Sequence, residues 1–336
     1  MTTATAEAKS NIALIKYWGK RDTRLNLPST GSLSMTLSSL GTRTTVTLDG
    51  ALESDELVLN GTPATEDALS RMSRFLDRVR RVGGFRERVR VETDNNFPTR
   101  SGLASSASGF AALSLAVTHA AGMDDDPDRL AGLARLGSGS APRSLLGGLV
   151  ELQPGVAPDG SDCLPRQLVA PGDWDVRLLV AMNTPDEKEV GSSDGMERTR
   201  RSSPLYEGWL RGNRVDLEVA LKAVRDRDFH TLGRVTEASC FRMHAAAMGA
   251  DPPIFYWNPV TLATVRLVRD LRESGVAGYV TIDAGPHVKV LCRPGDVRTL
   301  VEAIRGIKGI RQVIEERPGP GAELINASAS GPASAG

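Results

Sequence analysis

Residues 95–109 of this 336-residue chain read Asn-Asn-Phe-Pro-Thr-Arg-Ser-Gly-Leu-Ala-Ser-Ser-Ala-Ser-Gly. The strand-like pattern of Val89, Val91 and Thr93 leads into this stretch, and a helix rich in alanine and serine leaves it. Small residues let the backbone approach a phosphate closely, and the free N–H groups at the start of a helix favour anionic oxygens. The Walker pattern is absent. The stretch therefore predicts a phosphate loop of another type, or else a tightly packed helix of small residues.

The segments around this stretch mix strands and helices without the regular alternation of a parallel sheet, which favours an α+β fold. Periodicity predicts helices at 65–82, 126–136, 210–224, 229–248, 258–274 and 296–307. It predicts strands within 42–60 and at 89–93, 148–152, 176–182, 276–282, 288–292 and 311–315. Pro, Gly and Asp cluster between 154 and 175, so we expect an N-terminal lobe over 1–172 and a C-terminal lobe over 173–318. The Gly- and Pro-rich end, 319–336, is expected to be disordered.

Composition narrows the functional class. Lys plus Arg and Asp plus Glu both count 41, so the basic excess of a nucleic-acid-binding protein is missing. No apolar run approaches the roughly 20 residues needed to span a bilayer. The three cysteines are scattered, with neither a disulfide framework nor a zinc spacing. We expect a soluble cytoplasmic protein with no nucleic-acid or membrane partner.

Two further segments carry candidate anion-binding groups. Residues 137–144, Gly-Ser-Gly-Ser-Ala-Pro-Arg-Ser, form a loop with hydroxyls and Arg143, a plausible clamp for phosphate or carboxylate. Residues 11–21 run from an apolar strand into Lys16, Tyr17 and Lys20, where alternation would place Lys16 and Trp18 on one face. An incidental surface turn and a solvated strand exit remain the alternatives.

A last segment, residues 279–286, ends an apolar strand at Asp283 inside an Asp-Ala-Gly-Pro turn. A partly desolvated carboxylate at such a place can act as a base or as a cation-paired anion. Capping of the turn through the local backbone is the alternative.

Together and in this order, the segments resemble the diphosphomevalonate decarboxylases of the GHMP kinase superfamily. The resemblance covers roughly residues 8 to 295 and is carried by the opening N-I-A-L-I-K-Y-W-G-K-R, by N-N-F-P-T-R-S-G-L-A-S-S-A-S-G, by G-S-G-S-A-P-R-S and by D-A-G-P. It implies the GHMP kinase fold, with a ribosomal protein S5 domain 2-like N-terminal lobe, a GHMP C-terminal lobe and the site in the cleft between them. It also implies a homodimer.

The implied reaction is ATP-dependent decarboxylation of (R)-5-diphosphomevalonate to isopentenyl diphosphate, with ATP and Mg²⁺ as cofactors and a small phosphorylated molecule as substrate. By resemblance, the catalytic residues are Asp283, Lys16 and Arg143. Arg143 holds the substrate carboxylate, and further substrate contacts fall on Asn11, Tyr17, Lys20, Ser138 and Ser140. ATP contacts fall on Asn96, Gly102, Ala104, Ser105, Ser106, Ser192 and Ser193, the last two in a closing loop. Mg²⁺ is expected to be held mainly by the ATP phosphates and Ser106.

Three alternatives stay open at this point. A close relative could decarboxylate 5-phosphomevalonate, because the same cations accept one phosphate or two. A mevalonate 3-kinase-like enzyme could phosphorylate C3 without losing CO2. A non-catalytic nucleotide-binding regulator would not need Lys16, Arg143 and Asp283 together.

Overall fold

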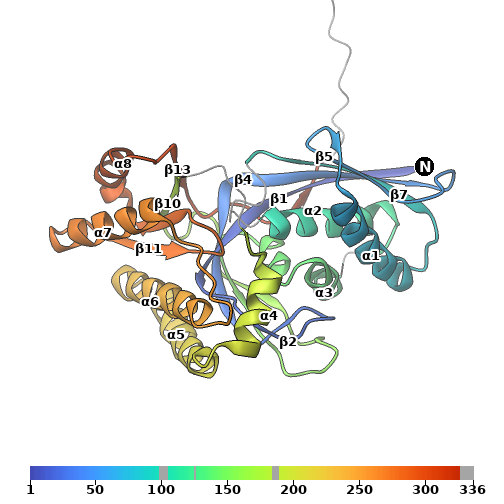
Figure 1. The fold of residues 1–336 in the computed structure, drawn as a ribbon. Helices are drawn as coiled ribbons and strands as arrows, with labels where there is room; N and C mark the ends of the chain where they lie inside the picture. The colour runs from blue at the N-terminus through green and yellow to red at the C-terminus, as the bar shows by residue number, and fades with distance from the viewer. Residues whose placement is uncertain (98–104, 125, 184–188, 326–336) are drawn as a thin grey trace, which may run out of the picture.

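The computed structural model describes residues 1–97, 105–124, 126–183 and 189–325. Two lobes lie side by side, each a sheet with helices packed on it (Figure 1). This arrangement confirms the predicted α+β class and its division into two lobes.

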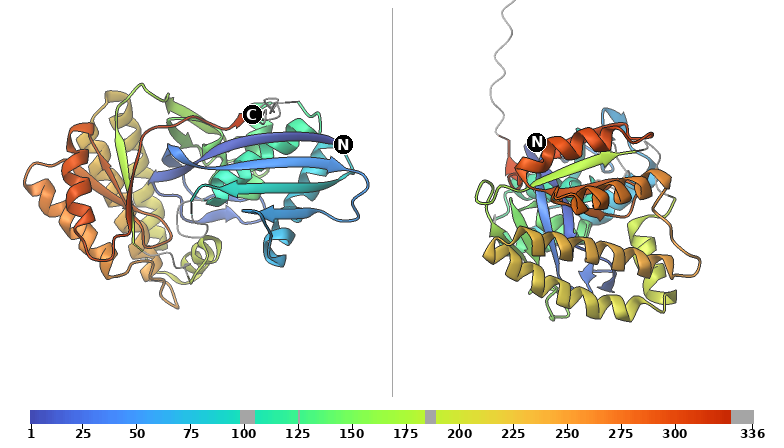
Figure 2. Two further views of the ribbon diagram at one scale, coloured as in Figure 1. Left: turned by 90° about the horizontal axis from the view of Figure 1, so that it is seen from above. Right: turned by 90° about the vertical axis from the view of Figure 1, so that its left-hand side faces the viewer.

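The N-terminal lobe is built on two long antiparallel strands, β1 (Thr2–Ile15) and β4 (Ser32–Asp49). Figure 2 (left) shows them in blue as the long axis of this lobe. Within the described residues, eight strands make up the sheet; the others are β5 (Glu56–Leu59), β6 (Thr62–Pro63), β7 (Arg88–Asn95), β8 (Leu149–Leu152), β9 (Pro165–Val169) and β14 (Glu323–Leu324). The short hairpin of β2 (Lys20–Asp22) and β3 (Leu27–Pro28) stands apart from it.

Three helices of this lobe, α1 (Glu66–Gly83), α2 (Ser105–Ala120) and α3 (Pro127–Gly137), share an apolar core with the sheet. Their ends follow from local chemistry. Thr65 accepts a hydrogen bond from Ala68 N at the start of α1, and Gly84 ends that helix at a φ of 71°. Asp126 caps α3, which begins at Pro127, as predicted. A short 3₁₀ turn, η1 (Ala141–Ser144), follows α3.

The C-terminal lobe has a four-stranded antiparallel sheet in the order β11-β12-β10-β13, counted over the described residues. The strands are β10 (Arg177–Met182), β11 (Gly278–Ile282), β12 (Val288–Cys292) and β13 (Gln312–Glu316). The helices are α4 (Ser192–Ser202), α5 (Tyr206–Asp226), α6 (Phe229–Met248), α7 (Pro259–Glu273) and α8 (Val297–Arg305), with the 3₁₀ turn η2 (Pro294–Asp296) before α8. In Figure 2 (right) α5 and α6 run side by side below this sheet.

The sheet of the C-terminal lobe is buried on both faces, which joins the lobes. Leu179, Val280 and Val290 pack in one apolar cluster with side chains of α7 and α8. Leu178 and Leu291 instead pack in a second cluster that includes side chains of β1 and β4. The two lobes therefore share a continuous apolar core beneath the cleft.

The first of three wrong expectations from the sequence concerns the C-terminal end. Residues 319–325 are not a disordered tail, because Gly319 N donates to Thr36 O at 2.8 Å and β14 pairs with β1. A Cβ on Gly319 would lie 2.0 Å from Leu37 O, so glycine here permits close backbone packing where composition suggests disorder. The rest of the predicted tail, 326–336, lies outside the described residues.

The second wrong expectation concerns Lys16 and Trp18, which do not share a strand face. Strand β1 ends at Ile15, so strand alternation no longer sets the direction of these side chains. Lys16 Nζ reaches Asp283, whereas Trp18 Nε1 donates to Thr199 Oγ1 on α4 at 3.1 Å.

None of the helices in the described part of the chain has the length and apolar character that crossing a membrane requires. The three cysteines, Cys163, Cys240 and Cys292, are buried and unbridged.

Candidate active site

A cavity of about 1370 Å³ lies between the end of β1, the starts of α2 and α4, and the turn between β11 and β12. Basic side chains dominate its described lining: Lys16, Lys20, Arg21, Arg24, Arg71, Arg74, Arg78, Arg143 and Arg200. The acidic side chains of the same lining are Asp22, Asp194, Glu197 and Asp283. Nine cations against four anions suit a polyanionic ligand, although the whole chain has no net charge.

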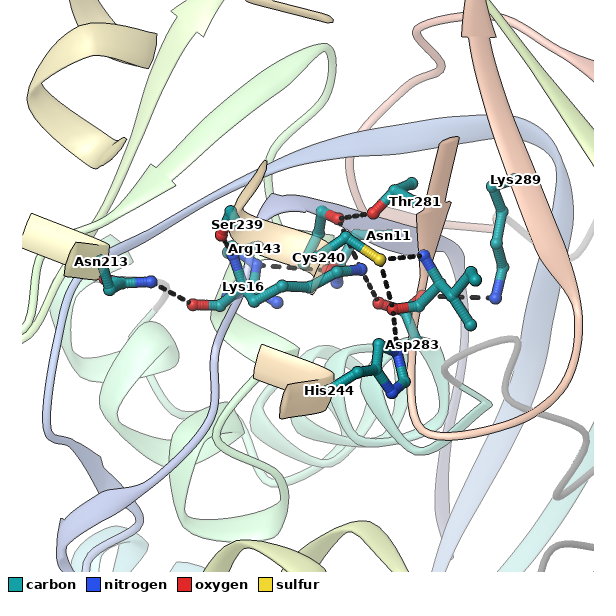
Figure 3. Close-up of polar contacts among 12 residues, drawn as sticks. Asn11, Lys16, Arg143, Asn213, Ser239, Cys240, His244, Thr281, Asp283 and Lys289 are labelled. Atoms are coloured by element: carbon teal, nitrogen blue, oxygen red, sulfur yellow. Dashed lines mark hydrogen bonds and ion pairs between the residues drawn. The ribbon is translucent and has the colours of Figure 1, made fainter. Parts of the chain in front are cut away.

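At the inner end of this cavity Asp283 lies between two lysines (Figure 3). Lys16 Nζ is 2.6 Å from Asp283 Oδ1, and Lys289 Nζ is 3.4 Å from Asp283 Oδ2. Burial raises the pKa of the Asp283 carboxyl, but the two lysine charges outweigh burial and bring the pKa down to about 2. Asp283 is therefore ionised throughout the neutral range.

The backbone around Lys16 and Asp283 is fixed by helices of the C-terminal lobe. Lys16 N donates to Ser239 Oγ on α6 at 3.1 Å, and Lys16 O accepts from Asn213 Nδ2 on α5 at 2.9 Å. Ile282, next to Asp283, bonds to α6 through Cys240 and His244. Figure 3 shows these contacts around Lys16 and Asp283. The end of β1 and the β11–β12 turn are thus held in register by the same helix.

Arg143 enters the cavity from η1 and is 2% exposed. Its Nε donates to Asn11 Oδ1 at 3.2 Å, and its Nη1 donates to Ser32 Oγ. Burial lowers the pKa of Arg143 to about 10, so the guanidinium stays charged at neutral pH. A fixed, buried cation that still lines the cavity is suited to hold a carboxylate in one orientation.

The Gly-Ser loop brings further polar groups to the same wall. Ser138 Oγ lies 3.4 Å from Ser106 Oγ and 3.3 Å from Ser140 Oγ. Tyr17 Oη is buried without a hydrogen-bond partner in the described structure, and burial raises the pKa of this phenol. A Cβ on Gly139 would lie 2.1 Å from Tyr17 Oη, so glycine is required for the loop to pass this side chain.

The cavity opens outward between α1, α2 and α4. Ser105 and Ser106 begin α2, and Lys20 Nζ donates to Asn26 Oδ1 at 2.7 Å and to Ser193 Oγ at 3.4 Å. Ser192 and Ser193 were expected in a loop, but they form the first turn of α4 and line the cavity there.

Of the remaining predicted nucleotide contacts, Asn96 is described and does not line the cavity. Asn96 uses both ends of its amide on β4, accepting from Gly41 N at 2.9 Å and donating to Ser39 O at 2.8 Å. Its role as an ATP contact stays a prediction. Gly102 and Ala104 lie outside the described residues.

Family models match both lobes. Residues 8–165 match the diphosphomevalonate decarboxylase-like N-terminal domain, and residues 178–324 match the mevalonate 5-diphosphate decarboxylase C-terminal domain. The chain belongs to the diphosphomevalonate decarboxylase family.

Comparison with individual members of the diphosphomevalonate decarboxylase family supports the same assignment. A relative of that name from Aspergillus fumigatus is 37% identical over 91% of this chain and 80% of its own. The solved mevalonate diphosphate decarboxylase from Staphylococcus aureus is 36% identical, with a TM-score of 0.91 over 96% of this chain and 98% of its own. A further structure, MDDEF in complex with MVAPP, AMPPCP and magnesium, is 38% identical, with a TM-score of 0.90 over 96% and 99% of the two chains. The GHMP kinase fold expected from the sequence is confirmed.

The structure also adds residues that the sequence reasoning missed. Lys289 contacts Asp283 directly, and Ser32 bonds to Arg143. A signal for Lys289 was present, because a lysine interrupts the otherwise apolar strand Val288–Cys292. Ser32 gave none, since its contact with Arg143 spans 111 positions of sequence.

Proposed function

We propose that this protein catalyses the ATP-dependent decarboxylation of (R)-5-diphosphomevalonate, giving isopentenyl diphosphate, ADP, phosphate and CO2. The observation that carries the proposal is the convergence of Lys16, Asp283 and Arg143 in one basic cavity, in a chain that both domains of this family match. Such a cavity offers separate groups for a hydroxyl, a carboxylate and phosphates.

ATP binding is supported by the start of α2, where small residues and the hydroxyls of Ser105 and Ser106 line the cavity. A helix N-terminus is suited to phosphate oxygens. The related structure MDDEF was solved with AMPPCP, a non-hydrolysable ATP analogue, and with magnesium. Ser192 and Ser193 at the start of α4 complete this part of the lining.

The residues present fit a magnesium ion that enters with the nucleotide. Magnesium prefers oxygen ligands and keeps several waters, with few ligands from protein. Among the described residues no group of three or more His, Cys, Asp or Glu could hold a metal ion, whereas Ser106 offers a hydroxyl beside the phosphate site. The ion would neutralise charge on the transferred phosphoryl group.

In the first step the C3 hydroxyl of the substrate takes the γ-phosphoryl group of ATP. Asp283 would receive the hydroxyl proton or align the hydroxyl, and Lys16, 2.6 Å from that carboxylate, would hold it in place. Phosphoryl transfer depends mainly on positioning and charge neutralisation. The paired and buried geometry of Lys16 and Asp283 suits that demand.

In the second step the C3–O bond breaks and phosphate leaves with its electron pair. The C1–C2 bond then supplies the electrons of the new C2–C3 double bond as CO2 departs. Arg143 would hold the carboxylate so that the breaking bond is aligned with the departing phosphate. Tyr17, Lys20, Ser138 and Ser140 would bind the remaining phosphates and hydroxyls.

A coupled ADP assay with mevalonate carrying two phosphates, one or none tests the substrate assignment. We expect kcat/KM to be highest for the diphosphorylated substrate. Preference for 5-phosphomevalonate would assign the protein to the other decarboxylase activity. If none of the three substrates leads to ADP formation, the proposed function is contradicted.

We also propose that the protein is a cytoplasmic homodimer. Its buried, unbridged cysteines suit a reducing compartment, and Val215 and Val219 form an exposed apolar pair on α5. Light scattering after size-exclusion chromatography decides between one chain and two.

A further inference from the structure

Lys289 is the second residue of β12 and its side chain is fully buried. Its neighbours in the strand, Val288 and Val290, are buried as well. Burial of a lysine in a strand core is costly, and a methionine of similar length would fill the space without the desolvation penalty. Stability alone therefore does not account for a charge at this position.

The charge of Lys289 is directed at the carboxylate of Asp283 (Figure 3). Its Nζ lies 3.4 Å from Oδ2, whereas Lys16 Nζ lies 2.6 Å from Oδ1. The two oxygens of Asp283 thus face two different cations that come from different strand ends. Rotation of the carboxylate about its Cβ–Cγ bond would break both contacts.

The other titratable groups around Asp283 come from α6 and η1. Burial lowers the pKa of His244 to about 3 and raises the pKa of Cys240 to about 11, so both are neutral at physiological pH. Arg143 adds its charge from η1. Of the described groups, Lys16 and Lys289 are the cations in direct ion-pair contact with Asp283.

We propose that Lys289 is a positioning residue for the reaction: it holds Oδ2 of Asp283 and leaves Oδ1 directed to Lys16 and the substrate hydroxyl. This rests on the proposed function only in assigning the reaction that Asp283 serves. Lys289 itself stays behind the carboxylate and does not line the cavity.

The test replaces Lys289 with methionine, which keeps length and removes the charge. We expect kcat to fall by about 10²-fold, because the carboxylate loses its fixed orientation, while KM for either substrate changes less than about threefold. The pKa of the Asp283 carboxyl should rise, since a cation that lowers it is gone, and the titration described below measures that rise. Lys289→Gln is the second variant, should the methionine variant not fold.

Leu291→Met is the matched control, because Leu291 is equally buried in β12 and lies two residues along, on the same face. Its kcat should stay within about twofold of the wild type. Wild-type kcat in a folded Lys289→Met variant would overturn the proposal. A loss of kcat with an unchanged titration of the Asp283 carboxyl would also overturn it, because that pattern indicates packing alone.

A readout without substrate separates this proposal from the proposed function. The ¹³C resonance of the Asp283 carboxyl, assigned by its loss in Asp283→Asn, can be titrated in the wild type and in Lys289→Met. We expect the carboxyl of the variant to titrate at higher pH by about one unit. Identical titrations overturn the role of Lys289, whichever substrate the enzyme proves to use.

Discussion

The inner and outer ends of the cavity differ in how deeply their charged side chains are buried and how firmly they are held. At the inner end Lys16 and Arg143 are buried and each bonds to several partners, with Asp283 paired beside them. At the outer end Arg24 and Arg74 are exposed to solvent. Charges act strongly where water is excluded and weakly where it is not. The inner end is therefore built for orientation, and the outer end for attraction of a charged ligand.

The largest effect is expected at Asp283. Asp283→Asn should lower kcat by about 10²–10⁴-fold, because the amide cannot take a proton and carries no charge for Lys16. Binding of ATP and substrate, measured by calorimetry, should change only a few-fold. Asp22→Asn, which lies in the same cavity, is the control and should keep most of the activity. If Asp283→Asn kept most of the wild-type kcat, the inner end would not be the part of the cavity on which the chemistry depends.

The next effect tests geometry against charge. Arg143→Lys should be nearly as poor as Arg143→Ala, with kcat lower by about 10²-fold, because an ammonium cannot hold both carboxylate oxygens. KM should stay within about tenfold if the phosphate contacts bind uniformly. Arg24→Lys at the outer end is the control and should change kcat little. If Arg143→Lys had a near-normal kcat, Arg143 would contribute only its charge, and the geometric role would be contradicted.

A smaller effect is expected when the support of Arg143 is removed. Asn11→Ala deletes the acceptor of Arg143 Nε and the donor to Ser144 Oγ at 2.8 Å. Loss of a hydrogen bond to a charged group costs about 1.5–3 kcal/mol, so we expect kcat to fall about tenfold and the melting temperature to drop. Steady-state kinetics and a thermal melt measure both. Unchanged kcat at a lower Tm would show that Asn11 serves stability alone.

The smallest effect is expected at the outer end. Arg74→Ala should raise KM for ATP less than about fivefold, because an exposed charge contributes little and is screened by salt. The difference from wild type should vanish at about 0.5 M NaCl, whereas the losses at Asp283 and Arg143 should persist. A large rise in KM for ATP in Arg74→Ala that persists at high salt would contradict this and would show that Arg74, too, holds the ligand in a fixed orientation.

Much of the fold could be predicted from local patterns. Helix α6 (Phe229–Met248) has the predicted bounds, and the β11–β12 hairpin around Asp283 lies where the apolar runs placed it. Short-range periodicity and capping determine such elements, so the sequence carries them directly. The full lengths of β1 and β4 were not predicted, although small residues such as Ala4, Ala6 and Ala8 alternate with polar ones in β1. Alanine is depleted in strands, so this alternation is a weaker strand signal than that of branched or aromatic residues.

Contacts between distant segments account for what the sequence could not show. Lys16 and Asp283 were both predicted by resemblance, but their pairing joins positions 267 residues apart. The contact of Lys289 with Asp283 depends on the pairing of β11 with β12, in which Ile282 lies opposite Val288. The return of β14 to β1 likewise depends on tertiary packing rather than on composition.

The ratio of CO2 released to ADP formed tests the central claim most directly. With diphosphomevalonate labelled with ¹⁴C at the carboxyl carbon, the account predicts one CO2 for each ADP, at every substrate concentration. ADP formation without CO2 would show a C3 kinase and contradict the decarboxylation assigned to Arg143 and the inner end of the cavity.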